Sequence, residues 1–214
     1  MFLPMYTHVW LPGKWHLGDS AGHSALERGF DETLTFPAGM SAYGKQTDPD
    51  IITLGLNGSM AHFDEFMRYS LPFTVSHNNQ EHFEPNEYLT DYLSHRAVDL
   101  IHTQQHTQRP FFLSLTYTAP HSPLQCTRRD YEALGHIANP TQRVYAAMVL
   151  ALERGIGEVL QALRDTNQHR NTLIIFTSDN GAAHYVGLPQ SNCPYRGWKA
   201  TLFEGGVRVP LFMQ

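Results

Sequence analysis

Three segments of the chain carry side chains that can bind an anion and transfer a proton. The segment PGKWHLGD, residues 12–19, places Lys14 and His16 two positions apart between two glycines. His121 lies in TAPHSP, and Lys199 lies in RGWKAT. A lysine offers a compact positive charge, and a histidine can give or take a proton near neutral pH. These residue types predict a site for a negatively charged group.

A fourth segment, FTSDNGA, supplies oxygen ligands for a hard cation. Asp179 offers a carboxylate and Asn180 an amide carbonyl. Such oxygens suit calcium, with magnesium as the less favoured choice, better than they suit zinc. Each of these residues alone has an ordinary explanation, since Asp-Asn-Gly is a common turn and a lysine is usually solvated. Their combination in one chain and in this order favours a functional site.

Two amphipathic helices are predicted on either side of the His121 segment. Apolar positions recur at helical spacing in residues 88–104 and again in residues 142–163. The first apolar stripe consists of Leu89, Leu93, Ala97, Leu100 and Ile101. Residues 36–87 are rich in Gly, Pro, Asn and Phe, which predicts long loops with short elements that shape a substrate pocket.

Two apolar runs predict buried strands that lead to the candidate residues. PFFLSLTYTAPHSP begins with such a run, is ended by prolines, and feeds a loop with His121. Residues 173–176 form the second run, which breaks at Ser-Asp-Asn-Gly and presents Asp179 and Asn180. Helices that alternate with apolar strands predict an α/β domain around a mostly parallel sheet. Because sites in such sheets form at the carboxyl ends of strands, we expect these residues at one edge.

The composition excludes several classes of protein. With 42% apolar and 16% charged residues among 214, the chain is expected to fold around a sizeable core. A net charge of -5 without a Lys/Arg cluster excludes nucleic acid as the partner. No run approaches the roughly 20 apolar residues of a membrane span, and residues 1–12 do not resemble a signal peptide. Cys126 and Cys193 are too few for a disulfide framework.

Taken together, the motifs resemble those of the sulfatase family, which has the alkaline-phosphatase-like fold. GKWHLG is similar to the family's second signature, and LFEGGVRVP is similar to the stretch after its late lysine. The resemblance covers nearly the whole chain and implies a three-layer α/β domain that hydrolyses sulfate monoesters of sugars or aryl alcohols. It implies that Asp179 and Asn180 bind one calcium ion. It also implies that four catalytic residues surround the sulfate: Lys14, His16, His121 and Lys199.

The chain departs from the family pattern at its nucleophile. Sulfatases use a formylglycine made from Cys or Ser in a C-x-P/A-x-R sequence, which lies upstream of the GKWHLG-like motif. The residues before Lys14 contain no such sequence. Cys126 heads CTRRD, which lacks the proline, and Cys193 heads CPYRG, in which proline and arginine each come one place too early. We therefore expect Cys193 to lie in the loop that delivers Lys199.

The resemblance thus predicts a partial sulfatase catalytic domain over residues 1–214, incomplete at both ends. The nucleophile segment, part of the calcium ligands and the small C-terminal subdomain are expected to be absent from it. Losing a nucleophile and an electrostatic stabiliser costs many orders of magnitude in rate, so the chain alone is expected to be inactive. Export to the periplasm, the lysosome or the extracellular space is what the family implies.

Two other functions stay open. A phosphatase or phosphonate hydrolase of the same superfamily would carry a Thr or Ser nucleophile and more His and Asp ligands, and the Lys-x-His pair with Lys199 disfavours it. A non-catalytic remnant that binds sulfated ligands would need no nucleophile. Three aromatic residues near Lys199 either fill the core or stack on a sugar or aryl ring: Tyr185, Trp198 and Phe203.

Overall fold

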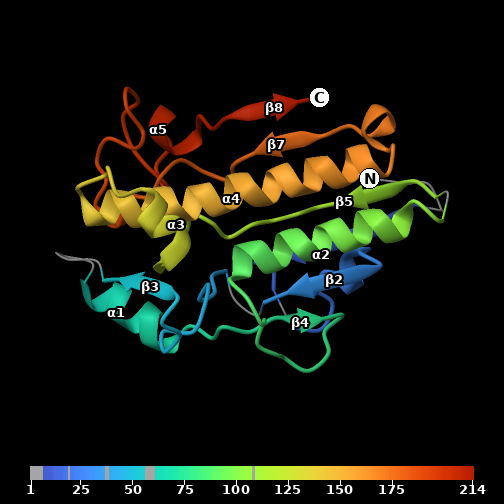
Figure 1. The fold of residues 1–214 in the computed structure, drawn as a ribbon, viewed down its shortest axis with the longest axis horizontal. Coiled ribbons are helices and arrows are strands. Elements are labelled where there is room, and N and C mark those ends of the chain that lie inside the picture. Colours follow the sequence, from blue (N-terminus) through green and yellow to red (C-terminus); the bar gives the residue numbers. More distant parts are fainter. Residues whose placement is uncertain (1–6, 19, 37–38, 56–60, 108) are drawn as a thin grey trace.

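Eight strands and five α-helices make up the described part of the computed structural model, which comprises residues 7–18, 20–36, 39–55, 61–107 and 109–214 (Figure 1). The strands are β1 (His8–Gly13), β2 (Glu32–Thr35), β3 (Ile51–Leu54), β4 (Ser76–His77), β5 (Phe111–Leu113), β6 (Leu124–Thr127), β7 (Ile175–Thr177) and β8 (Leu211–Met213). The α-helices are α1 (Ala61–Ser70), α2 (Leu89–Gln104), α3 (Arg128–Ala133), α4 (Pro140–Asp165) and α5 (Glu204–Val207). The signal-peptide expectation concerned residues 1–12, of which residues 1–6 lie outside the described part. Residues 37–38 and 56–60 of the predicted loop region also lie outside it.

A four-stranded sheet ends at the first candidate motif. Its order is β4-β2-β1-β5, with β1 parallel to both β2 and β5 and with β4 antiparallel to β2. Trp10 of β1 is in register with Glu32 of β2 and with Leu113 of β5. The apolar run of β1 is buried, as expected for a strand that is covered on both faces. The predicted mostly parallel sheet is therefore confirmed.

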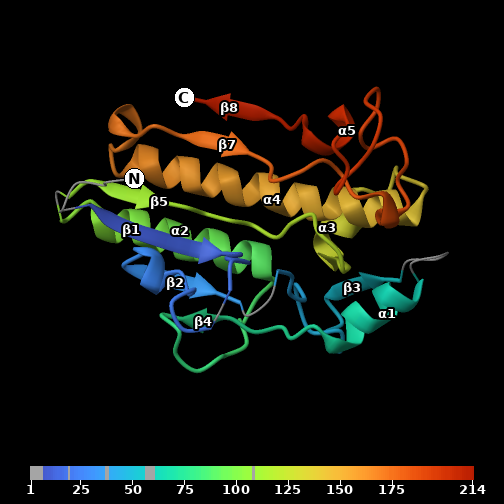
Figure 2. The ribbon, with the colours of Figure 1, turned by 180° about the vertical axis from the view of Figure 1, so that it is seen from behind.

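The two long helices pack against each other beside this sheet (Figures 1 and 2). Helices α2 and α4 are in contact, and α2 also contacts β1. Helix α4 begins after Asn139, whose Oδ1 accepts a hydrogen bond from the backbone N of Gln142 at 3.0 Å. Leu93 of α2 and Met148 of α4 are fully buried in one core cluster. Both predicted helices are confirmed, each with boundaries within three residues of the prediction.

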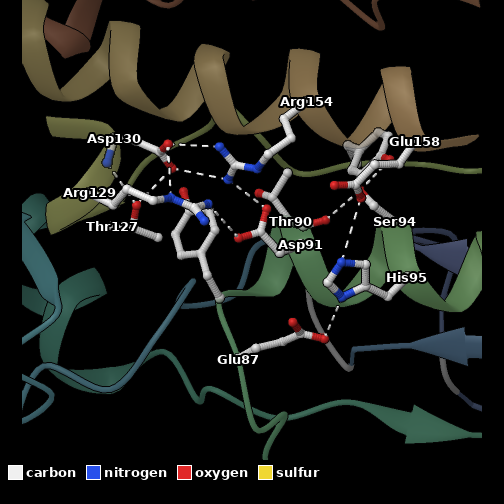
Figure 3. A network of polar contacts seen from close by, with 12 residues as sticks. Glu87, Thr90, Asp91, Ser94, His95, Thr127, Arg129, Asp130, Arg154 and Glu158 are labelled. Carbon is white, nitrogen blue, oxygen red and sulfur yellow. Dashed lines mark hydrogen bonds and ion pairs between the residues drawn. The ribbon is translucent and has the colours of Figure 1, made fainter. Parts of the chain in front are cut away.

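An ion-pair network joins α2, α3 and α4 (Figure 3). Arg154 of α4 donates from Nη1 to Oδ1 of Asp130 and from Nη2 to Oδ1 of Asp91, each at 2.7 Å. Asp130 belongs to the first turn of α3, and its Oδ2 also accepts from Oγ1 of Thr127 at 2.7 Å. Thr127 in turn caps α3, because its Oγ1 accepts from the backbone N of Asp130. The network therefore connects the first turns of α2 and α3 with the middle of α4.

The strand predicted at residues 173–176 is present as β7, but the expectation that it is buried is wrong. All three β7 residues are exposed, and Ile175 retains 57% of its accessible surface. Among the described residues β7 pairs only with β8, antiparallel, and β8 is exposed as well. A groove lies between β5 and β7 and is lined by Leu113, Leu160 of α4 and Phe176. The apolar run thus lines an open groove instead of a closed core.

The remaining elements agree with the sequence pattern. In the described part of residues 36–87, β3, α1 and β4 are short elements between loops, as predicted. Strand β3 pairs with β6 in an antiparallel pair of its own. The described helices include none that is long and apolar enough to cross a membrane.

Candidate active site

The end of β1 delivers Lys14 into the groove. Gly13 has a φ of 120°, and a Cβ at this position would lie 2.1 Å from the backbone O of Thr116, so glycine is required. The backbone N of Lys14 donates to that oxygen at 2.8 Å. The Lys14 side chain is 17% exposed, and its Nζ lies 3.8 Å from Oδ2 of Asp179. Burial lowers the pKa of Lys14, as does the charge of Lys199, whereas Asp179 opposes this shift.

His121 is held by its backbone and by both nitrogens of its ring. Tyr43, which is fully buried, donates from its hydroxyl to the backbone O of His121 at 2.9 Å. Nδ1 of His121 lies 2.7 Å from the backbone O of Ser122, and Nε2 lies 2.9 Å from Nζ of Lys199. Burial lowers the pKa of His121 and the two lysines add to this effect, although the contact with Ser122 opposes it. The lowered pKa favours the neutral form of the His121 ring, which lies next to the side-chain nitrogen of Lys199.

A loop anchored by Asn192 brings Lys199 to this position. The backbone N of Lys199 donates to O of Ala182 at 3.2 Å. Oδ1 of Asn192 accepts from N of Ala182 at 2.8 Å, while its Nδ2 donates to O of Ala182 at 2.9 Å and to O of Gly197 at 3.2 Å. Cys193 lies in the same loop, as predicted, and its side chain is exposed. Asn192 thus ties the segment after β7 to the segment before Lys199.

Asp179 and Asn180 follow β7 and line the same groove. The Asp179 side chain is 70% exposed, and the amide nitrogen of Asn180 donates to the backbone O of Gly181 at 3.0 Å. That contact turns the amide nitrogen toward the backbone and leaves Oδ1 as the atom suited to a cation. No group of three or more His, Cys, Asp or Glu that could hold a metal ion occurs among the described residues. A carboxylate and an amide oxygen suit a hard cation such as calcium, which takes about six to eight oxygens, so these two side chains alone would not complete its shell.

His16 lines the groove as well, but within the described residues its ring forms no hydrogen bond or ion pair with the other candidates. Its φ is 54°, its side chain is exposed, and no described residue forms a hydrogen bond with its ring. The ring lies against Gly39, where a Cβ would be 2.2 Å from Nε2. All six predicted residues line one groove, but only Lys14, His121, Asp179 and Lys199 are joined into contacting pairs.

Sequence reasoning missed Tyr43 and Asn192, and it assigned Tyr185 no role in holding His121. Tyr43 and Asn192 act through backbone groups, and nothing in the local pattern distinguishes them from ordinary core or loop residues. Of the three aromatic residues near Lys199, Tyr185 alone lines the groove. Trp198 packs on the ring of His184 at 4.5 Å, and Phe203 packs under Arg196, outside the groove lining. The stacking hypothesis is thus left with Tyr185 alone within the groove.

The fold and the groove define an α/β protein in which two lysines and a histidine, Lys14, Lys199 and His121, line one groove. The Sulfatase family model matches residues 9–214, and the chain belongs to the sulfatase family. N-acetylgalactosamine-6-sulfatase of Canis lupus familiaris is 33% identical over 202 residues, which cover 92% of this chain and 35% of that protein. The uncharacterized sulfatase YdeN of Escherichia coli is 32% identical over 158 residues, covering 71% of this chain and 28% of YdeN.

Solved structures agree with this assignment. The crystal structure of Ps i-CgsB in complex with k-i-k-neocarrahexaose superposes with a TM-score of 0.81 at 34% identity, covering 97% of this chain and 44% of that one. The PsFucS1 sulfatase from Pseudoalteromonas sp. gives a TM-score of 0.70 at 26% identity, over 97% of this chain and 42% of that one. These neighbours confirm the α/β fold class of the alkaline-phosphatase-like sulfatases. The chain spans about a third of the length of the curated relatives it matches.

Proposed function

We propose that the protein hydrolyses sulfate monoesters to inorganic sulfate and the free alcohol. The observation that carries this proposal is the convergence of Lys14, His121 and Lys199 on one groove of a sulfatase-family chain. A sulfate monoester is an anion, and negative charge builds on its bridging oxygen as the sulfur–oxygen bond breaks. Positive groups that are already in place stabilise this charge without reorganising during the reaction.

Each of the four catalytic candidates has a role that follows from its chemistry. Lys14 and Lys199 hold the sulfate oxygens as point charges. Lys199, whose Nζ lies 2.9 Å from Nε2 of His121, supplies the proton that the leaving oxygen takes up, and the neutral His121 ring orients this ammonium group by accepting at Nε2. His16, which lines the same groove, contacts the ester with its exposed ring.

Calcium is the cation proposed for Asp179 and Asn180. Sulfatases generally use calcium, and a carboxylate beside an amide oxygen is a donor set that calcium accepts. Calcium takes about six to eight oxygens, so these two side chains form one part of its shell. When bound, the ion would supply positive charge at the sulfate. The charge of Lys14, whose Nζ lies 3.8 Å from Oδ2 of Asp179, would add to it.

We propose that residues 1–214 form part of a catalytic domain and do not turn over substrate by themselves. Neither cysteine is suited to act as the nucleophile. Cys126 is buried, which raises the pKa of its thiol to about 12, and it therefore stays protonated. Cys193 is exposed in the loop before Lys199, and its Sγ contacts Oε1 of Gln190 at 2.6 Å. The formylglycine nucleophile must come from outside these residues.

Among sulfate esters, a sulfated carbohydrate is the substrate class we favour. One relative is named for N-acetylgalactosamine 6-sulfate, and one solved neighbour is bound to neocarrahexaose. Since such glycans lie outside the cytoplasm, we place the protein in the periplasm, the lysosome or the extracellular space. Cell fractionation with an antibody against the protein tests this location.

The experiment that tests the function uses the protein as its cells make it. Intact mass and peptide mapping establish its length and whether it carries a formylglycine peptide. Sulfate release from aryl sulfates and from sulfated galactosides is then measured by ion chromatography, with a Lys199→Ala variant as comparison. Loss of one such stabilising group is expected to lower kcat by about a hundredfold or more.

Two outcomes would oppose the proposal. Release of phosphate from phosphomonoesters, with no release of sulfate, would favour a phosphatase of the same superfamily. Binding of a sulfated oligosaccharide without turnover, in a protein without formylglycine, would show a binding remnant instead of an enzyme.

A further inference from the structure

The two ring nitrogens of His121 have different partners, and these partners define its tautomer. The backbone O of Ser122 can only accept, so Nδ1, at 2.7 Å from it, carries the hydrogen. In the neutral ring Nε2 is then an acceptor. Two groups that can donate lie near it: Nζ of Lys199 at 2.9 Å and, at the longer distance of 3.5 Å, the hydroxyl of Tyr185, which also interacts with the side chain of Ser122. The Tyr185 contact has no role in the function proposed above.

Tyr185 is partly buried and packs against the core cluster that contains Leu93 and Met148. It lies in the 3-10 turn His184–Val186, between the buried Val186 and the segment that follows Asp179 and Asn180. Val186 belongs to the same core cluster as Leu93 and Met148. Burial raises the pKa of the Tyr185 hydroxyl, which therefore keeps its hydrogen at neutral pH.

The two donors to Nε2 differ in how an incoming anion affects them. Lys199 is charged, so a sulfate group in the groove draws its ammonium toward the sulfate oxygens. The Tyr185 hydroxyl is neutral and attached to a ring that has only two rotatable side-chain bonds. It can therefore stay at Nε2 when the ammonium turns away.

We infer that Tyr185 is a positioning residue for His121, whose hydroxyl donates to Nε2 and keeps the ring directed into the groove while Lys199 binds the anion. This inference rests on the proposed function for its catalytic consequence, but its geometric part stands independently. The charged groups that act on the ring are Lys14, Lys199 and Asp179. A donor at Nε2 favours the neutral ring, so removal of the hydroxyl is expected to raise the pKa of His121.

The test compares Tyr185→Phe with the unchanged protein, both expressed from the complete natural reading frame. Histidines labelled with nitrogen-15 are titrated by NMR, and the His121 signal is assigned through its loss in His121→Gln. The titration of His121 is expected to move to higher pH in Tyr185→Phe. With a sulfate ester, kcat is expected to fall about three- to tenfold, the value of one neutral hydrogen bond, with little change in KM. Tyr92→Phe, in which a partly buried tyrosine of α2 loses its hydroxyl, is the matched control.

Three results would each overturn the inference. A His121 titration that does not move in Tyr185→Phe would show that the hydroxyl does not act on Nε2. A rise in KM with kcat unchanged would make Tyr185 a substrate contact instead. A lower melting temperature with an unmoved titration would leave it a structural role only. If the protein releases no sulfate at all, the proposed function fails, while the titration still decides whether Tyr185 acts on the ring.

Discussion

Replacing Arg154 by methionine is expected to destabilise the protein strongly, because it leaves a buried carboxylate without its main partner. Figure 3 shows the guanidinium of Arg154 between the carboxylates of Asp91 and Asp130. The Asp130 side chain is only 4% exposed, and that of Arg154 is 27% exposed. Methionine retains much of the length and the packing of arginine while it removes the charge and the donors.

The size of the destabilisation caused by Arg154→Met follows from the burial of the Asp130 carboxylate. Breaking a buried ion pair by removing one partner costs about 3–5 kcal/mol. Asp130 keeps the hydrogen bond from Thr127 and a longer contact with Arg129 at 3.6 Å, so we expect the lower end, about 3 kcal/mol. For a chain of this length, each kcal/mol lowers the melting temperature by about 2–4 °C. The expected drop in melting temperature is therefore about 6–12 °C.

The effect is measured by thermal and urea unfolding of the natural protein. Arg164→Met is the control, because Arg164 lies on the same helix but, within the described residues, its guanidinium hydrogen-bonds only the exposed side chain of Gln161. It should change the free energy of unfolding by less than about 0.5 kcal/mol. The double variant Arg154→Met with Asp130→Leu should be more stable than Arg154→Met alone, since the unpaired charge is gone. Equal losses for Arg154→Met and Arg164→Met would refute the reasoning.

The same network has a pH dependence of known sign. Burial alone would raise the pKa of Asp130, but hydrogen bonds from Arg154 and Thr127 outweigh it and lower the pKa. A carboxyl whose pKa is lower in the folded state stabilises the fold above its unfolded pKa, and this stabilisation is lost as the pH falls through the folded pKa. The advantage of the unchanged protein over Arg154→Met should therefore shrink as the pH falls, and it should be lost once Asp130 is protonated in both proteins, below the usual range of an aspartate.

Three further predictions concern other parts of the structure. Gly39→Ala puts a methyl group against the ring of His16, so kcat for an aryl sulfate is expected to fall by about tenfold or more. The control is Gly157→Ala, which adds its methyl group in open space and should leave kcat unchanged. A hydrogen bond from His95 to Glu87 raises the pKa of His95. This contact therefore stabilises the fold in acid, and the stabilisation is lost as the pH rises through the folded-state pKa of His95. His95→Gln should lower the melting temperature near pH 5 and have little effect on it near pH 9. Chelation of calcium from the natural protein is expected to abolish sulfate release, and added calcium should restore it where zinc does not, as followed by ion chromatography.

Local patterns predicted the two long helices, α2 and α4, correctly. The apolar stripe that includes Leu89 and Leu93 predicts α2, because the periodicity of one buried helix face is visible in the sequence itself. His121, Asp179 and Asn180 were expected at one edge of a single sheet. They line one groove, but within the described residues β7 pairs with β8 and does not join the sheet of β5.

Contacts between distant segments were not accessible in this way. The hydroxyl of Tyr43 reaches the backbone of His121, 78 residues away, and neither residue type nor spacing indicates this. The error at residues 173–176 has a different origin. An apolar run indicates that its side chains are buried in the folded protein, but it does not indicate which residues bury them.

The exposed strands β7 and β8 have a practical consequence for work with the isolated chain. Leu173, Leu211 and Phe212 retain between 59% and 70% of their accessible surface, and β5 and β7 each pair on one side only within the described residues. Open strand edges that carry apolar side chains pair readily with other copies. A preparation of residues 1–214 is therefore expected to form concentration-dependent oligomers in sedimentation experiments. A low activity of this preparation must therefore be tested for two causes, the absence of catalytic groups and the association of the chain into oligomers.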